Sequence, residues 1–228
     1  MTAAPLLHAL FPNIDDWGEI GQGCVDTLLM LGGSLALTVL IGLPLGVLLY
    51  LTARGQLRAM PRLYGLTALI VNVLRSIPFI ILMIVLMPVT YFLVGTRLGI
   101  RGAIPPLVIG AAPFFARLVE TSLREVQPGV IEAAQAMGAS TWQIVRRVLL
   151  PEARSGIAAA ITVTAIALVG YTAMGGAIGA GGLGDLAYRY GYLSYKSDYM
   201  VVTVFLLIVL VQALQVIGER IVTRLSRH

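Results

Sequence analysis

A stretch without a charged residue runs from Gly156 to Gly184 and reads GIAAAITVTAIALVGYTAMGGAIGAGGLG. It is longer than the roughly 20 apolar residues that a helix needs to cross a bilayer. A strand of a membrane barrel would instead alternate apolar and polar residues over about 10 positions, and this stretch shows no such alternation. It therefore predicts a membrane-spanning helix.

Four further stretches share this character. Those at 27–53, 76–96 and 199–218 are uncharged and long enough to span a bilayer. The stretch at 102–116 is long enough only if its helix continues to about Leu123. The sequence therefore predicts an all-α, polytopic membrane protein with five transmembrane helices. We expect these spans at about 27–51, 66–94, 104–123, 156–177 and 199–218.

Composition supports the same class. Of the 228 residues, 58% are hydrophobic and only 12% are charged, about half the charged share of an ordinary soluble domain. A soluble globule needs more polar residues to cover its surface, and a disordered chain needs more charge. One cysteine, Cys24, and two histidines, His8 and His228, make a thiolate or histidine metal site unexpected, and we expect no cofactor.

The basic residues are distributed unevenly between the two sides of the predicted membrane. Cytoplasmic loops of membrane proteins are enriched in Lys and Arg. One side holds Arg54, Arg58, Arg62, Arg124, Arg146, Arg147, Arg154, Arg220, Arg224 and Arg227, and the other holds Arg97, Arg101, Arg189 and Lys196. We therefore expect an outer N-terminal leader at 1–23 and a cytoplasmic basic tail at 223–228. Topology accounts for the net charge of +5, so no nucleic-acid partner is expected.

The inner segment 124–154 carries the signals of two short helices. Pro128-Gly129 predicts a turn followed by a helix, with Ile131, Ala134 and Met137 near one of its faces. Gly138 fits the stop of this helix. The pair Ser140 and Gln143 matches the capping-box pattern, so a second helix should begin at Thr141 and end at Pro151. We call this pair of helices, residues 128–151, the knob.

Catalytic signals are weak. The run 179–184 satisfies G-x-G-x-x-G, but it follows a membrane helix and not a strand, so a flexible turn or a docking surface is favoured over nucleotide binding. The chain has no G-x-x-x-x-G-K-[ST] loop and no plausible Ser-His-Asp or Cys-His arrangement. We therefore expect no enzyme activity from this chain alone.

Three charged residues lie within or near the predicted spans. We expect Arg75, Arg117 and Glu120 close to the cytoplasmic interface, where long side chains reach water. Arg117 and Glu120 stand at i and i+3, so they can pair on one side of a helix. We favour a structural role for these charges over a direct role in transport.

The knob carries a motif with fixed spacing. Its residues are Glu132, Ala133, Ala134, Gly138, Val148, Leu150 and Pro151. This pattern resembles the EAA loop of ABC importer permeases, EAA-x3-G-x9-I-x-LP, with Val148 in place of Ile as the one departure. The resemblance implies a type I ABC importer permease fold, in which this cytoplasmic loop is the coupling helix and docks on a separate ATPase subunit.

The resemblance extends over about 24–222, the expected permease domain, and is closest to the methionine importer permeases. The stretches that carry it are RSIPFIIL at 75–82, GAAPF at 110–114, VGYTAMGGA at 169–177 and YGY at 190–192. It implies a homodimer in the lipid of the inner membrane and two copies of a P-loop ATPase. It also implies a periplasmic or lipid-anchored methionine-binding protein.

These stretches supply candidate residues for the translocation path, namely Arg75, Ser76, Pro113, Tyr171 and Met174. Other interpretations stay open: a permease for another small solute, such as an osmoprotectant or another amino acid, a secondary carrier or channel, or a membrane scaffold. The knob favours a permease, because a carrier that works alone needs no rigid element to transmit movement from a partner subunit.

The knob also suggests how force could be transmitted. We expect Glu132 in the first turn of its helix, where a carboxylate is favoured by the helix dipole. Ala133 and Ala134 should keep the surface slim enough to enter a cleft, and Gly138 should permit the turn between the helices. Pro151 should end the second helix and set its angle to the next span.

Overall fold

The computed structural model describes residues 11–226. The expected leader (1–23) and basic tail (223–228) fall partly outside this range, and His8 and His228 lie outside it. Within residues 11–226 the chain is helical and contains no strand. The all-α fold expected from the sequence is therefore confirmed.

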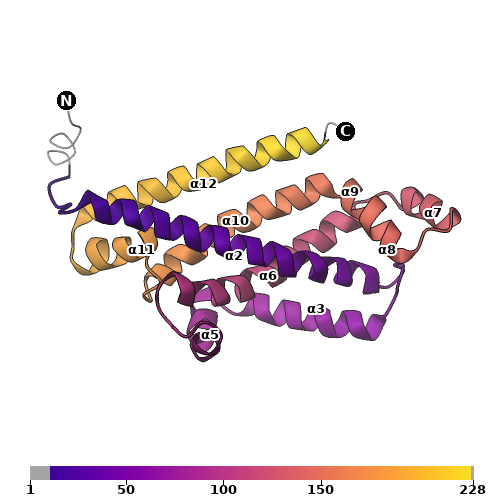
Figure 1. Cartoon of the computed structure of the whole chain (residues 1–228), viewed down its shortest axis with the longest axis horizontal. Helices are drawn as coiled ribbons and strands as arrows, with labels where there is room; N and C mark the ends of the chain where they lie inside the picture. Colours follow the sequence, from indigo (N-terminus) through magenta and orange to yellow (C-terminus); the bar gives the residue numbers. More distant parts are fainter. Residues whose placement is uncertain (1–10, 227–228) are drawn as a thin grey trace. The chain divides into compact units, whose positions relative to one another are not determined.

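The helices follow one another closely along the chain (Figure 1). In order they are α2 (Trp17–Thr52), α3 (Pro61–Ser76), α4 (Phe79–Val85), α5 (Met87–Val94), α6 (Gly99–Arg124), α7 (Pro128–Ala136), α8 (Thr141–Ile144), η1 (Val145–Leu149), α9 (Leu150–Glu152), α10 (Arg154–Gly176), α11 (Gly182–Leu186), η2 (Ala187–Leu193) and α12 (Ser197–Ser226). The two η elements are π-helices.

Four of these helices are long and apolar enough to cross a membrane. They are α2, α6, α10 and α12, and α3 with α4 supplies a fifth span if this bent pair is counted as one. The second expected span, 66–94, is not one continuous helix. Pro78 lacks an N–H and forces Ile77 into extended backbone, with φ −80° and ψ 125°, so α3 ends before it.

The first and last long helices extend beyond the expected spans. Helix α2 already begins at Trp17, within the expected leader, and α12 continues to Ser226, within the expected tail. The segment 178–198 contains α11 and η2, so the run 179–184, for which a flexible turn or a docking surface was favoured, includes the start of a helix.

The chain divides into two compact units, which are described separately. The first comprises the residues up to 34, 79–107 and 166–213, and the second comprises 35–78, 108–165 and 214 onward. In the second unit, α2 lies against α6 through two glycines. A methyl group on Gly46 would lie 2.6 Å from Val119 Cβ, and one on Gly42 would lie 2.7 Å from a ring carbon of Phe115. These glycines therefore serve packing.

The first unit also depends on close backbone contact. A methyl group on Gly176 would lie 2.2 Å from the backbone nitrogen of Asp185, and one on Gly184 would lie 2.4 Å from the carbonyl oxygen of Ala173. Thr27 of α2 accepts a hydrogen bond from the buried N–H of Leu183 at 2.9 Å. The glycines of the run 179–184 thus allow close packing within this unit, so the run is not a free turn.

Candidate functional site

The knob is built from α7, α8, η1 and α9, which lie together in the second unit (Figure 1). Pro128 begins α7 in the first turn, where a missing N–H costs nothing. The chain reverses at Gly138, whose φ of +78° is favourable only for glycine. The predicted pair of short helices joined at a glycine is confirmed, although Pro128 and Gly129 belong to the first helix and do not form a turn before it.

A capping box starts the second helix of the knob. The N–H of Ser140 donates to Gln143 Oε1 at 2.7 Å, and the N–H of Gln143 donates to Ser140 Oγ at 3.4 Å. Both bonds satisfy N–H groups that have no partner inside the helix. The predicted start at Thr141 is therefore confirmed. The helical run continues to Glu152, so Pro151 lies within it and does not end it.

One side of the knob packs into the core of the second unit. Ala134, Ile144 and Leu149 are buried there, against residues of α2 and α6 such as Tyr50 and Leu123. Val148 and Leu150 of the EAA motif are half-buried against the same cluster. This contact stabilises the knob, because it removes the apolar face of two short helices from water.

The opposite side of the knob exposes large apolar side chains. Met137 is 81% exposed and Trp142 is 69% exposed, and they flank the turn at Gly138. Met137 was expected near the same helical face as Ile131 and Ala134, but α7 ends at Ala136 and the Met137 side chain is exposed. Sequence analysis therefore missed both residues. The Trp that follows Ser140-Thr141 was the available signal, since aromatic residues are enriched at the centres of protein interfaces.

The EAA residues themselves divide between the two sides. Glu132, Ala133 and Gly138 are exposed, whereas Ala134 is only 3% exposed. The expectation that Ala133 and Ala134 share one docking surface is therefore wrong, because adjacent helical positions point about 100° apart. Glu132 is the fifth residue of α7 and lies beyond its first turn, so the expected stabilisation by the helix dipole is also wrong.

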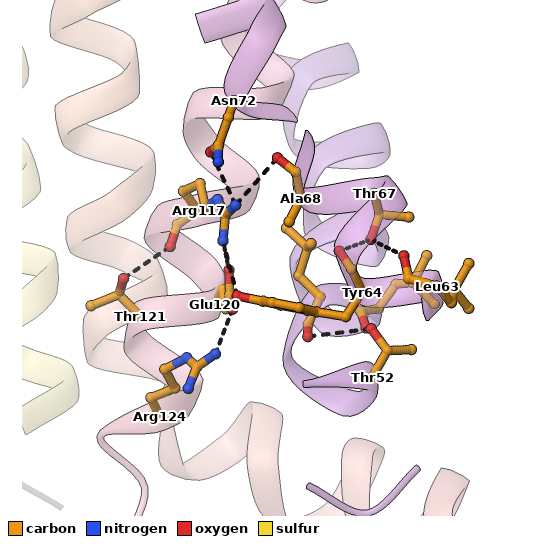
Figure 2. Close-up of polar contacts among 12 residues, drawn as sticks. Thr52, Leu63, Tyr64, Thr67, Ala68, Asn72, Arg117, Glu120, Thr121 and Arg124 are labelled. Carbon is orange, nitrogen blue, oxygen red and sulfur yellow. Dashed lines mark hydrogen bonds and ion pairs between the residues drawn. The ribbon is translucent and has the colours of Figure 1, made fainter. Parts of the chain in front are cut away.

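A buried carboxylate joins α6 to α3 (Figure 2). Glu120 is 3% exposed and forms two ion pairs within α6, with Arg117 at 2.7 Å and with Arg124 at 2.8 Å. Tyr64 of α3 donates its hydroxyl to the same carboxylate at 3.3 Å. The predicted Arg117–Glu120 pairing is confirmed, and the partners Arg124 and Tyr64 were not foreseen.

Arg117 extends this cluster along α3 (Figure 2). Its Nη2 donates to Asn72 Oδ1 at 3.0 Å and to the carbonyl oxygen of Ala68 at 3.4 Å. One turn further along the same two helices, the Arg75 guanidinium lies over the Phe114 ring at 5.8 Å from its centroid. The α3–α6 contact therefore carries a continuous series of polar and cation–π contacts through a region that is otherwise apolar.

The five candidate path residues differ in exposure. Arg75 and Ser76 are exposed on α3, and Met174 is exposed on α10. Pro113 is buried within α6, and Tyr171 is half-buried against Phe79, with ring centroids 4.3 Å apart. The first unit holds Tyr171 and Met174, and the second holds the other three. A lining role for all five stays a prediction.

The segment 178–198 is held by polar contacts within the first unit. Tyr190 donates its hydroxyl to Glu19 at 3.0 Å, a bond that raises the pKa of Tyr190. Lys196 pairs with Asp15, which raises the pKa of Lys196. The exposed apolar and aromatic residues of this segment are Tyr188, Tyr192, Leu193 and Tyr195.

The fold and the motif can now be compared with known proteins. The family described as "Binding-protein-dependent transport system inner membrane component" matches residues 28–228. The chain belongs to this family. It is an all-helical, multi-pass inner-membrane component of a transport system.

Similar proteins match over almost their whole length. The chain is 50% identical over 224 residues to the probable D-methionine transport system permease protein MetI of Vibrio cholerae serotype O1, which covers 96% of this chain and 99% of that protein. It is 48% identical over 223 residues to the methionine import system permease protein MetP of Bacillus subtilis strain 168, covering 98% and 100% respectively.

A solved structure shares the fold. It is described as "Inward facing conformations of the MetNI methionine ABC transporter: CY5 SeMet soak crystal form". The TM-score is 0.90 at 50% sequence identity, over 92% of this chain and 97% of the compared chain.

Proposed function

We propose that this chain is the permease subunit of an ATP-driven importer and that it forms the translocation path for methionine across the inner membrane. The names and full-length similarity of its relatives support methionine as the substrate. A permease for another small solute, such as an osmoprotectant or another amino acid, is the alternative against which this proposal is tested.

The single observation that carries the proposal is the two-sided knob. One face is fixed in the core of the permease, and the other presents Met137 and Trp142 to a partner. Met and aromatic side chains are enriched at the centres of protein interfaces. The partner we propose is a separate P-loop ATPase subunit, two copies of which would serve a homodimer of this chain. The chain itself carries no Walker sequence, so we expect it to hydrolyse no ATP alone.

The orientation follows from the same assignment. The knob and the end of α12 would lie in the cytoplasm, and the beginning of α2 with the segment 178–198 would lie outside. The distribution of Lys and Arg supports this orientation. A methionine-binding protein would then dock on the outer side near 178–198. Impermeant thiol labelling of Gln135→Cys in a Cys24→Ala background should fail in intact cells; labelling there would reverse the proposed topology.

Uptake measurements test the substrate. Cells that express the chain with its ATPase and binding protein should accumulate labelled methionine, and deletion of the gene should abolish this uptake. Unchanged methionine uptake together with lost uptake of another solute, such as a quaternary amine, would assign the chain to a related permease group.

Co-purification tests the docking surface. Trp142→Ala should reduce recovery of the ATPase with the permease, because truncation of a central aromatic anchor typically costs at least about 2 kcal/mol of binding. The matched control is Tyr192→Ala, which removes an aromatic residue of similar exposure from the segment 178–198. Equal recovery of the ATPase with both variants would exclude Trp142 as an anchor.

A further inference from the structure

Helix α3 carries an exposed polar face near its C-terminal end. Asn72, Arg75 and Ser76 are exposed and stand at i, i+3 and i+4, so they lie on one side of the helix. Arg75 is the one charged residue between 63 and 96. It lies 13 residues after Arg62, or about 20 Å along the helix axis at 1.5 Å per residue.

This depth is incompatible with contact between Arg75 and lipid tails. The hydrocarbon core is about 30 Å thick, so a helix that enters the membrane near Arg62 carries Arg75 well inside it. Charged side chains at such depth face protein or a water-filled cavity. Among residues 11–226 Arg75 forms no ion pair or hydrogen bond, and Phe114 is its one aromatic partner. Its N–H groups are thus available to a ligand.

The contact with Phe114 holds the guanidinium in place. Its Cζ lies over the ring, 5.8 Å from the centroid, and the contact uses none of the N–H donors on the guanidinium edge. Such an edge matches two carboxylate oxygens at once, whereas it offers nothing to an ammonium group or a cation.

Asn72 adds a second donor, and Arg117 determines how it points (Figure 2). A guanidinium can only donate, so the Asn72 amide must turn its oxygen towards Arg117, at 3.0 Å. The amide nitrogen, with two N–H donors, is then directed away from Arg117. Glu120 in turn holds Arg117 at 2.7 Å. Arg117 and Glu120 are therefore positioning residues for the exposed amide.

We propose that Arg75 and Asn72 form a binding site for the carboxylate group of the transported amino acid as it passes along α3. The inference rests on the proposed function, since it takes an amino acid as the substrate. It revises the expectation that Arg75 lies near the cytoplasmic interface and serves only structure. Ser76 does not bind in this scheme, because its hydroxyl already donates to the carbonyl oxygen of Asn72 at 2.8 Å.

Ser76 can instead report on the site. In a Cys24→Ala background, Ser76→Cys in the purified permease–ATPase complex should react with a charged, water-soluble methanethiosulfonate. Ile70→Cys is the matched control, because Ile70 is exposed on the opposite side of α3 and should face lipid. No reaction at position 76, or equal reaction at both positions, would exclude an aqueous path along this face.

Substrate protection then tests the carboxylate. Methionine should protect Ser76→Cys from labelling at a concentration at least tenfold lower than methioninol, which has a hydroxymethyl group in place of the carboxylate. Arg75→Gln should abolish this difference, and Arg75→Lys should retain part of it. Absence of methionine protection with Arg75 present, or an unchanged difference in Arg75→Gln, would overturn the proposal.

Asn72→Asp tests the site with little disturbance of the fold. Its carboxylate can pair with Arg117 in the position of the amide oxygen, yet it should repel a second carboxylate. Methionine protection should therefore require at least tenfold more methionine, while the ATPase still co-purifies. An unaltered protection curve would overturn the role of Asn72. Methionine uptake by the unaltered complex, measured in parallel, separates failure of this site from failure of the proposed function.

Discussion

The knob and the segment 178–198 both connect two long helices, yet they are organised in opposite ways. The knob buries small and branched side chains and exposes two large apolar ones, Met137 and Trp142. The segment 178–198 buries its glycine backbone, at Gly182 and Gly184, together with the side chains of two leucines, and exposes three of its tyrosines, Tyr188, Tyr192 and Tyr195. Each is therefore fixed on one side and exposed on the other. Buried side chains fix the knob, whereas the segment 178–198 adds close backbone contact at its glycines to its buried and polar side-chain contacts.

This difference decides where each region tolerates change. A knob held by side chains can accept a new side chain on its exposed face without loss of its own fold, so that changes there should affect partners. Where backbone lies against backbone, as at Gly184, the segment 178–198 cannot accept even a methyl group, because no side chain is there to move aside. The predictions below test this contrast, from the largest expected effect to the smallest.

The largest effect is expected from Gly184→Ala. Its new methyl group would lie 2.4–2.8 Å from three backbone atoms of Ala173, so a helix must shift. Overpacking of this kind costs about 1–3 kcal/mol, occasionally more. The control in the knob is Gly129→Ala, where no atom lies within 4 Å of the added group. Thermal unfolding of the two purified variants measures the difference, and equal midpoints would contradict it.

The next effect separates two adjacent positions of the knob. Ala134→Leu adds volume in the buried cluster and should destabilise the chain by about 1–3 kcal/mol. Ala133→Leu is exposed, so it should leave thermal unfolding unchanged and reduce recovery of the ATPase. Similar melting curves for both variants would show that Ala133 and Ala134 share one environment after all.

The same contrast explains which parts of the fold the sequence could predict. The two helices of the knob follow from local signals: the Ser140–Gln143 box and Gly138 act within a few residues. The helices of 178–198 do not, because their glycines are set by contacts with Ala173 and Thr27, distant in the sequence. A glycine-rich run looks the same whether it is free or tightly packed.

The candidate site shows the same limit. The pairing of Arg117 with Glu120 follows from their spacing on one helix, but the contacts with Tyr64 and Asn72 depend on how α3 meets α6. The exposure of Met137 depends on the residue at which α7 ends, and helical periodicity does not fix such ends. The sequence alone therefore could not predict the long-range contacts or the residues at which helices end.

A smaller effect is expected from Gly138→Val. There is room for a side chain, since no atom lies within 4 Å of the added Cβ, but the φ of +78° costs a β-branched residue about 1–2 kcal/mol. We expect reduced transport and reduced ATPase recovery while insertion into the membrane continues. Gly138→Asn is the control, because Asn tolerates the left-handed region. Full methionine uptake by Gly138→Val would argue against a coupling role for this turn.

The smallest effect is expected from Ser140→Ala, which removes one half of the capping box. Loss of a Ser cap typically costs about 1 kcal/mol, and because the cap serves a short helix, the loss should appear as local opening before global unfolding. Hydrogen exchange should accelerate in α8 and η1, by about fivefold for 1 kcal/mol. Exchange in 178–198 should stay unchanged, since no capping box supports that segment. Gln135→Ala changes an exposed side chain of α7 that forms no hydrogen bond within residues 11–226, so this matched control should leave exchange as it is. Faster exchange in both regions after Ser140→Ala would mean that the knob is held by the whole fold and not by its own local signals.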